Sequence, residues 1–443
     1  MANQKDRVKF NVGGKTFDTT ATTFAVAGRN SFFGALFDEN WNLQPDSSNS
    51  NEYFINRDPD CFGVLLNLLR TGKLYIPSNI PEKLIYDEAL FYGLLDHVRS
   101  AKWGPFNGNR LRLSQSIRNY AADVGTVIRA GPHGGCCVAH GNVVHVYDWM
   151  LEEHPPVNLD FQKVNDVGWI DEETFVVGAS ERRGGGGGLG LFSASTGELR
   201  HRFQVTCWDQ VKGYVAGALC SSSDKIFSSC KTGNKFNYKN GIYVWDQVTG
   251  KQIDFYHESF GQSLSNVERL QWLQGTNCLM VASFLPLSQE NYSLIALWDV
   301  RVKNRVWQWF DCPSEDGSQK HQVRDVIAME EANSICVVNE YEDLGFLDLR
   351  NPEKVRWGKG LRKFSMRNEQ SQVKLALHNG QLFLSMDDRI SVFCGPDWEL
   401  TSRLRRPNGA AISDISLGGD RLFALPREGN VFDVWETPRP PLL

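Results

Sequence analysis

The stretch NVGGKTF, residues 11–17, places two glycines between two runs of alternating apolar and polar residues. Before it, Val8, Phe10 and Val12 alternate with polar residues, which is the pattern of a half-buried β-strand. A Gly-Gly pair enters positive-φ space without steric cost and therefore fits a tight hairpin turn. A phosphate-binding loop is the alternative, but no third spaced glycine accompanies the pair. The stretch predicts a β-hairpin.

Strand and helix signals alternate over the next eighty residues. Asp58 followed by Pro59 is a helix start, with an N-cap residue and then proline at the first helical position. Gly72 stands where a helix commonly ends. The segments are a helix in SFFGALF (31–37), a strand in EYFIN (52–56), a helix in CFGVLLNLLR (61–70), a strand in KLYIP (73–77) and one helix in LIYDEALFYGLLDHV (84–98).

Four motifs in this region, NVGGKTF, YFINRD, LLNLLRTGKLYIP and EALFYGLL, carry a family resemblance. In this order they resemble the tetramerisation-type BTB/POZ domain of voltage-gated potassium channels and KCTD proteins. The resemblance covers residues 7–100 and implies an α+β domain that assembles into a tetramer or pentamer. The family often has Asp where Asn56 stands, whereas Arg57 and Asp58 follow the motif. The resemblance places Arg57 and Asp58 at the oligomer interface.

Two properties of potassium-channel subunits are not expected here. No apolar run approaches the roughly 18–20 residues of a membrane helix, so a pore subunit is excluded. Some channel-type domains bind zinc between subunits through a His and closely spaced cysteines, but Cys61 is the one cysteine within residues 7–100. Cys136 and Cys137 follow His133 without a second ligand pair at zinc spacing. We expect no metal site.

The whole-chain composition indicates a globular protein of two or three domains in a reducing compartment. The 443 residues carry a formal net charge of -5, which gives no electrostatic footprint for nucleic acid or an anionic membrane. The ten cysteines form no CxxC pair and are expected to be buried thiols. The N-terminus lacks the apolar segment of a secretory signal. We expect a cytoplasmic location, and the basic cluster Arg403, Arg405 and Arg406 leaves a nuclear location open.

The rest of the chain has a repeating pattern of apolar alternating runs, mostly closed by Asp and a turn. The runs recur at intervals of roughly 40–53 residues, the range of propeller repeats. We expect a linker over 101–120 and a β-propeller over 121–443, closed by its last strand. The runs are VVHVYDW (143–149), LGLFSASTGEL (189–199), IYVWDQVTGKQI (242–253), LIALWDVRVKNRV (294–306), LGFLDLRNPEKV (344–355), RISVFCGPDWEL (389–400) and NVFDVWE (430–436).

Two of these runs carry a familiar dipeptide. Trp245-Asp246 and Trp298-Asp299 resemble the Trp-Asp of WD40 repeats, while the Gly-His dipeptide of those repeats is absent. The resemblance implies a WD40-like propeller of about seven blades, with six and eight left open. A pair of β-sandwiches is the alternative architecture, which the long regular period makes less favourable.

No catalytic pattern is present in the sequence. It contains neither an HExxH zinc motif nor a GxSxG nucleophile elbow. Isolated acidic pairs such as Asp387-Asp388 are typical of solvated turns. We therefore expect a binding protein without catalytic residues and without a cofactor.

The expected architecture points to a role in assembly. BTB proteins with a C-terminal recognition domain resemble substrate adaptors of cullin-3 RING ubiquitin ligases, and this chain is most similar to the plant group. By that resemblance the BTB domain would bind cullin-3 through Leu36, Phe37, Asp38 and Glu39, and the propeller would hold an unidentified target protein. A non-ligase scaffold that clusters signalling or channel partners is the alternative, because it also needs an oligomer and a propeller.

Overall fold

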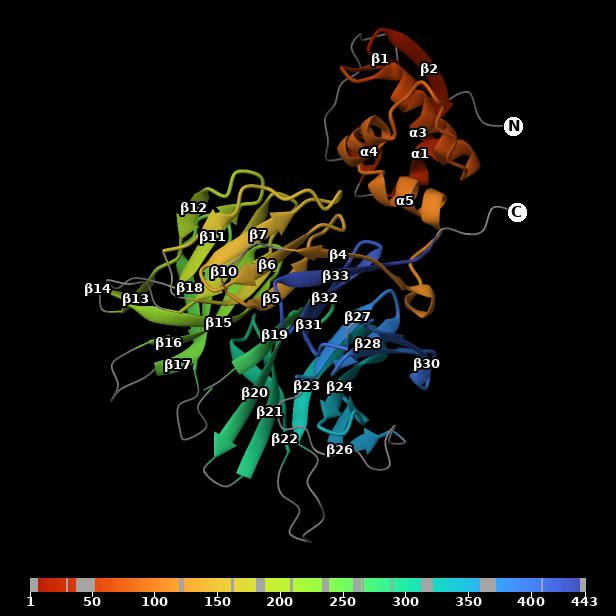
Figure 1. Cartoon of the computed structure of the whole chain (residues 1–443). Helices are drawn as coiled ribbons and strands as arrows, with labels where there is room; N and C mark the ends of the chain where they lie inside the picture. Colours follow the sequence, from red (N-terminus) through yellow and green to blue (C-terminus); the bar gives the residue numbers. More distant parts are fainter. Residues whose placement is uncertain are drawn as a thin grey trace. The chain divides into compact units, whose positions relative to one another are not determined.

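The computed structural model forms two compact units, 1–110 with 437–443 and 111–436, and each is described by itself. Figure 1 labels their helices and strands. The structure describes residues 7–28, 31–36, 52–118, 123–160, 163–180, 188–207, 210–232, 239–257, 264, 267–287, 290–311, 322–358, 372–407 and 409–438.

The N-terminal unit combines a small sheet with five helices among its described residues. In the sheet, ordered β2-β1-β3, β1 pairs antiparallel with β2 and parallel with β3. Its elements are β1 (Arg7–Val12), β2 (Lys15–Thr20), α1 (Ala21–Ala25), α2 (Phe32–Leu36), β3 (Glu52–Ile55), α3 (Pro59–Thr71), α4 (Glu82–Phe91), α5 (Leu95–Trp103) and a 3-10 turn, Gly108–Arg110.

The predicted β-hairpin is confirmed. Val12 pairs with Lys15, and the turn between them places Gly13 and Gly14 at φ 53° and 91°. Both values lie in the region that favours glycine. At Gly13 a Cβ atom would also stand 2.6 Å from the backbone oxygen of Arg57. Only glycine therefore fits the position at which the hairpin packs against the start of α3.

Both predicted ends of α3 are confirmed. The Asp58 carboxylate accepts hydrogen bonds from the backbone N–H groups of Asp60 and Cys61, at 2.9 and 2.8 Å. Gly72, at φ 69°, donates its N–H to Leu68 and ends the helix in the left-handed conformation. The cap and the glycine together satisfy backbone groups that a helix leaves unpaired at its ends.

Two sequence predictions for this unit are wrong. The segment 73–77 forms no strand, because Pro77 cannot donate a backbone hydrogen bond and the Tyr75 side chain is 80 % exposed. The segment 84–98 is not one helix, since α4 and α5 are separated at Gly93, which has φ 66°. Gly93 donates to Leu90, and Leu94 donates to Ala89, as in a Schellman helix end.

Aromatic rings fill the core of the N-terminal unit. The Phe33 ring stacks on Phe24 and on Tyr92, with centroids 4.1 and 5.3 Å apart, and Phe10 and Phe62 enclose the group. All five side chains are at most 2 % exposed. This core fixes α2 against α3 and the loop that follows α4.

The described residues of the second unit form seven four-stranded antiparallel sheets, together with a hairpin of β13 (Val205–Cys207) and β14 (Gln210–Lys212). The sheets are β5 (Gly125–Ala130), β6 (Cys136–His140), β7 (Val143–Tyr147), β8 (Val157–Asn158); β9 (Val164–Trp169), β10 (Thr174–Ala179), β11 (Leu189–Ser193), β12 (Leu199–Arg202); β15 (Tyr214–Ser221), β16 (Lys225–Thr232), β17 (Lys239–Asp246), β18 (Gln252–Tyr256); β19 (Val267–Leu273), β20 (Cys278–Leu287), β21 (Glu290–Asp299), β22 (Asn304–Phe310); β23 (Val323–Met329), β24 (Ser334–Asn339), β25 (Leu344–Asp348), β26 (Asn351–Trp357); β27 (Lys374–His378), β28 (Gln381–Met386), β29 (Arg389–Cys394), β30 (Glu399–Arg405); and β31 (Ile412–Gly418), β32 (Arg421–Pro426), β33 (Val431–Glu436), β4 (Arg112–Arg118). A 3-10 turn, Glu330–Ala332, joins β23 to β24.

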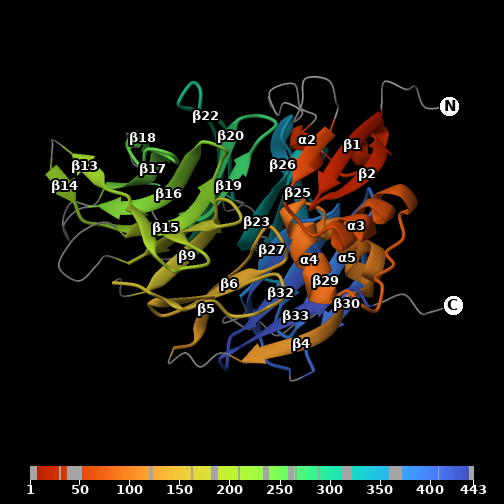
Figure 2. The same ribbon diagram turned by 90° about the horizontal axis from the view of Figure 1, so that it is seen from above.

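The sheets are arranged as a closed ring, which is the predicted β-propeller. The first strands β5, β9, β15, β19, β23, β27 and β31 contact one another in that order, and β31 contacts β5. In Figure 2 the sheets follow one another around a centre, from β5 through green β16 to blue β33. The chain that enters the ring supplies β4 as the outer strand of the last sheet, where it pairs with β33. The segment 101–120, expected as a linker, thus contributes this closing strand.

The seven recurring runs occupy equivalent places, because each supplies the third strand of one sheet. The Asp that closes several of these runs shapes the following turn. Asp246 accepts hydrogen bonds from the backbone and hydroxyl groups of Thr249, and Asp299 accepts three from Arg301. Among the helices that the structure describes, none is long and apolar enough to span a bilayer.

Candidate functional site

The stretch expected to contact cullin-3 begins at the last residue of α2. Leu36 is 6 % exposed, and Phe33 in the same helix is fully buried, so both belong to the core of the N-terminal unit. Phe32 is half-buried and meets the rings of Phe33 and Phe91 at 5.5 and 5.7 Å. Phe37, Asp38 and Glu39 lie outside the described residues.

Arg57, expected at an oligomer interface, has partners within its own unit. Its guanidinium pairs with the buried carboxylate of Glu88 at 2.9 Å and lies 4.2 Å from the ring centroid of Phe91. Burial raises the pKa of Glu88, and the hydrogen bond from Arg57 opposes that shift. The Arg57 side chain is one-third exposed and the Phe91 ring is 44 % exposed. Both can still meet another molecule, and the interface role of Arg57 and Asp58 stays a prediction.

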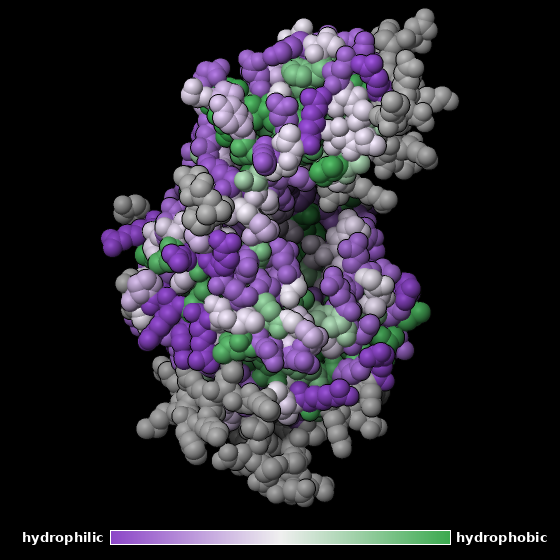
Figure 3. Space-filling model, turned by 90° about the vertical axis from the view of Figure 1, so that its right-hand side faces the viewer, coloured by the Kyte–Doolittle hydropathy of each residue, from purple (hydrophilic) through white to green (hydrophobic). Residues whose placement is uncertain are grey.

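On the face drawn in Figure 3, hydrophilic residues predominate and hydrophobic ones form separate small areas. Large apolar side chains that are more than 40 % exposed in the N-terminal unit are Val26, Phe54, Tyr75 and Phe91. Isolated exposed apolar residues are usual on monomer surfaces.

The centre of the propeller is lined by a repeated carboxylate. Asp166, Asp325 and Asp414 stand near the start of β9, β23 and β31. Each accepts a hydrogen bond from a backbone N–H of the next first strand around the ring, at 2.6–3.1 Å. The donors are Leu219, Leu375 and Ile128, respectively. These carboxylates join neighbouring sheets where no main-chain ladder connects them.

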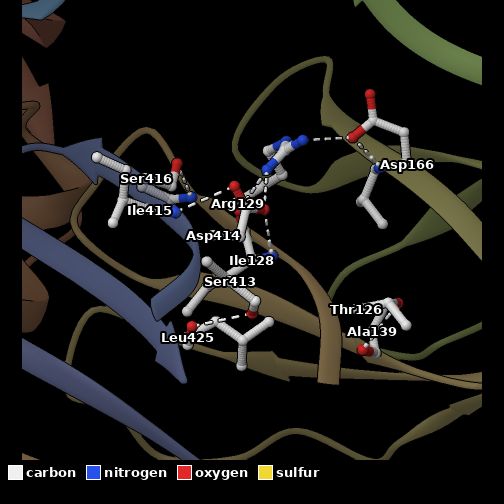
Figure 4. Close-up of polar contacts among 12 residues, drawn as sticks. Thr126, Ile128, Arg129, Ala139, Asp166, Ser413, Asp414, Ile415, Ser416 and Leu425 are labelled. Carbon is white, nitrogen blue, oxygen red and sulfur yellow. Dashed lines mark hydrogen bonds and ion pairs between the residues drawn. The ribbon is translucent and has the colours of Figure 1, made fainter. Parts of the chain in front are cut away.

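Two arginines complete these links. Figure 4 shows Arg129 between Asp166 and Asp414, and its nitrogens lie 2.7 and 2.6 Å from their oxygens. Arg269 binds Asp325 at 2.7 Å and donates to the backbone oxygen of Leu375 at 3.1 Å. Burial alone would lower the pKa of Arg129, but the two carboxylates outweigh it and raise that pKa above its ordinary value. Arg129 therefore joins three consecutive sheets as a permanent cation.

A cavity of about 330 Å³ lies within this channel. Its lining has equal numbers of acidic and basic side chains, but only some of them form ion pairs. Among the described residues, Glu268, Arg324 and Lys374 make no ion pair within 4.0 Å. The charged lining residues are Arg129, Arg269, Arg324, Lys374, Asp166, Glu268, Asp325 and Asp414.

The electrostatics of this channel centre on Glu268. Among the described lining residues there is neither His nor Cys. Glu268 is exposed to the channel, yet the surrounding protein raises its pKa, Lys374 lowers it and Asp325 raises it further. A solvent-accessible carboxylate beside two cations can select charged groups by electrostatics.

The cysteines and histidines of the described chain form no group that could hold a metal ion. Eight cysteines are free of disulfide bonds, and burial raises the pKa of Cys61 and of Cys137 to about 12. His133 pairs with Glu172 rather than with Cys136 or Cys137.

The channel residues escaped the sequence analysis, although a signal was present. The segments VNDV (164–167), VRDV (323–326) and ISDI (412–415) share an aliphatic residue, a variable residue, Asp and another aliphatic residue. The pattern occurs at the start of three of the seven first strands. The pattern is short and absent from the other four first strands, so the repeat that is visible in the sequence comes from the third-strand runs.

The fold and the comparisons with known proteins define the class as a BTB/POZ domain followed by a β-propeller. Residues 8–101 match the BTB/POZ domain family, and residues 119–437 match the family described as At2g24240-like, C-terminal beta propeller. The chain belongs to this family of BTB/POZ domain proteins with an At2g24240-like propeller.

The relatives agree with this assignment. The chain is 61 % identical over 448 residues to the BTB/POZ domain-containing protein At2g24240 of Arabidopsis thaliana, and the match covers all of both chains. It is also 61 % identical over 450 residues to At4g30940 of the same plant, again over both full lengths. The human BTB/POZ domain-containing protein KCTD5 is 37 % identical over 95 residues, which cover 21 % of this chain and 40 % of KCTD5.

Proposed function

We propose that this protein is a substrate adaptor of a cullin-3 RING ubiquitin ligase. The BTB domain binds cullin-3 and self-associates into a tetramer or pentamer, and the propeller recruits the target protein in the cytoplasm. The observation that carries the proposal is the pairing, in one chain, of a KCTD-type BTB domain with a separately compact propeller whose channel has unpaired charges. The adaptor itself contributes no catalytic group.

Oligomerisation gives this pairing a physical advantage. Several propellers on one particle raise the effective concentration of binding sites for a target with more than one recognition segment. A weak interaction at each propeller then suffices for stable recruitment.

The cullin contact rests mainly on Phe37 and Asp38. Leu36, which precedes them, is 6 % exposed in the domain, so the variants are placed at Phe37 and Asp38. An aromatic side chain beside carboxylates is typical of the anchors that dominate protein interfaces.

The test is the affinity of the full-length protein for the purified N-terminal domain of cullin-3. Phe37→Ala and Asp38→Lys should each weaken binding tenfold or more while the oligomer mass stays unchanged by light scattering. Asp87→Lys reverses a charge on the exposed side of α4 and serves as the matched control, with binding within twofold of the parent. If both variants bind like the parent, or if both change the oligomer mass, the contact is assigned wrongly.

The same sample tests the assembly. Light scattering should give four or five times the chain mass of 50.0 kDa, and a monomer at micromolar concentration would contradict the proposal. An intact oligomer that binds no cullin-3 would instead favour the non-ligase scaffold.

A further inference from the structure

The first strands of the propeller share a distortion beside the channel. Six of the seven carry residues that have no partner on the second strand, whereas β27 pairs regularly within the described residues. Such β-bulges redirect a side chain and commonly lie next to functional sites. The extra residues are Thr126, Asn165, Gly217 with Ala218, Glu268, Arg324 and Ser413.

Three bulges hold small polar side chains that bond to nearby backbone. Thr126 donates to Ala139 at 3.3 Å and Ser413 donates to Leu425 at 3.0 Å, as Figure 4 shows. Asn165 donates to the backbone oxygen of the next sheet at 2.7 Å. At these positions the bulge residue has a structural partner.

Two consecutive sheets depart from this arrangement. Their bulge residues, Glu268 and Arg324, are charged and make no hydrogen bond or ion pair with another described side chain. Lys374 follows on the next first strand and is equally unpaired in the described part of the chain. The Asp325 side chain accepts the N–H of Leu375, so the preceding residues, Arg324 and Lys374, both lie next to this contact between adjacent first strands.

The channel lining is neutral as a whole, but its unpaired charges are mainly cationic. Arg129 and Arg269 are held by the aspartates that join the sheets. Arg324 and Lys374 face the same cavity with Glu268 as the one unpaired carboxylate among its described charged residues. Two neighbouring cations opposed by one carboxylate favour an incoming anion.

We propose that Arg324 and Lys374 form an anion-binding site in the propeller channel, which takes a carboxylate or phosphate group from an acidic peptide segment of a target protein. The choice of a target protein as the partner rests on the proposed recruitment function. The cavity of about 330 Å³ suits a few side chains, and Phe284 is the one aromatic residue in its described lining, which gives little surface for stacking nucleobases.

Glu268 limits the affinity of this site. Its carboxylate lies near both cations and repels an anion that approaches them. Replacing it with the neutral and nearly isosteric Gln should strengthen binding. A purely structural role of the three residues predicts no such gain.

The test uses fluorescence anisotropy of the full-length protein with two labelled hexapeptides, one with three glutamates and one with three phosphoserines. Arg324→Ala with Lys374→Ala should weaken binding at least tenfold, and Glu268→Gln should tighten it at least twofold. The control, Arg403→Ala with Lys251→Ala, removes two exposed cations outside the cavity and should change binding less than twofold. Inorganic phosphate should compete for the phosphoserine peptide.

The outcomes separate this site from the adaptor role. Binding of either peptide with the expected variant pattern supports the site, and the tighter peptide identifies carboxylate or phosphate as the preferred group. Absence of binding to both peptides, or an equal loss in the control, overturns it. Circular dichroism checks folding, and if the double variant unfolds, an unchanged affinity in Glu268→Gln overturns the site. Cullin-3 affinity, measured in parallel, should be the same in every channel variant and reports on the adaptor role alone.

Discussion

The third strands and the first strands of the propeller sheets differ in what repeats. The third strands repeat their residues, since several end in an Asp that caps the next turn, as Asp246 and Asp299 do. The first strands repeat a bulge, but its occupant changes from Thr126 to Arg324. The Asp at the end of a third strand recurs because it shapes a turn that several sheets share. The bulge residue of a first strand varies, so it is available for ligand binding.

The largest effect is expected in a third strand. Trp245 is fully buried between the rings of Tyr214 and Tyr243, and its indole N–H donates to the backbone oxygen of Gln204 at 3.1 Å. Trp245→Ala should lower the free energy of unfolding of the propeller by about 3–5 kcal/mol. Urea unfolding followed by tryptophan fluorescence measures it.

Val248→Ala is the control for this measurement. Val248 lies in the turn after the same strand and is 92 % exposed, so its truncation should change stability by less than about 0.5 kcal/mol. If Trp245→Ala lowers the stability by no more than Val248→Ala does, the recurring third-strand residues do not support the fold and the comparison fails.

The next effect contrasts two arginines of the first strands. Arg129→Ala leaves the carboxylates of Asp166 and Asp414 without their cation and should cost about 3 kcal/mol, the lower end for a buried pair because Arg129 is about one-third exposed. Arg324→Ala removes an unpaired cation from the same channel and should cost less than about 0.5 kcal/mol. Urea midpoints of the two variants give the difference directly. Equal losses of stability in the two variants would show that Arg324 has a structural role, which would contradict its proposed role in binding an anion.

In the N-terminal domain, the features predicted correctly are those in which single residues dictate the geometry. The Gly-Gly turn and the Asp58 cap have one structural solution each, and both are found. Gly93 was missed because the apolar pattern continues through it, although its left-handed conformation ends α4.

The propeller was predicted as an architecture closed by its last strand, but neither the strand that pairs with β33 nor the channel was predicted. Closure uses β4, whose pairing with β33 joins residues about 320 apart in sequence and leaves no local signal. The channel is assembled from one or two residues of each first strand, so no stretch of sequence shows Arg324 beside Lys374. Such juxtapositions come from the ring and not from local propensity.

The smallest effect concerns the pH dependence contributed by Glu268. Burial raises its pKa above the ordinary 4.5, Asp325 raises it further, and the cations Lys374 and Arg324 lower it. The folded protein therefore holds this proton more tightly than the unfolded chain does. Its contribution favours folding while the group is protonated, and it is lost as the pH rises from about 4.5 through the folded pKa.

Glu268→Gln removes this dependence and leaves the other carboxylates in place. The melting temperatures of the variant and the parent should be closest at acidic pH, below the ordinary pKa of 4.5, where the Glu268 side chain is mostly protonated. The variant should become the more stable of the two as the pH rises toward 7, and the gap should then stay constant. Arg403→Ala, outside the channel, should show no such gap. If Glu268→Gln instead loses stability at pH 7, the Glu268 carboxylate supports the fold through Arg324 and Lys374, and these first-strand cations are paired by structure rather than available to a ligand.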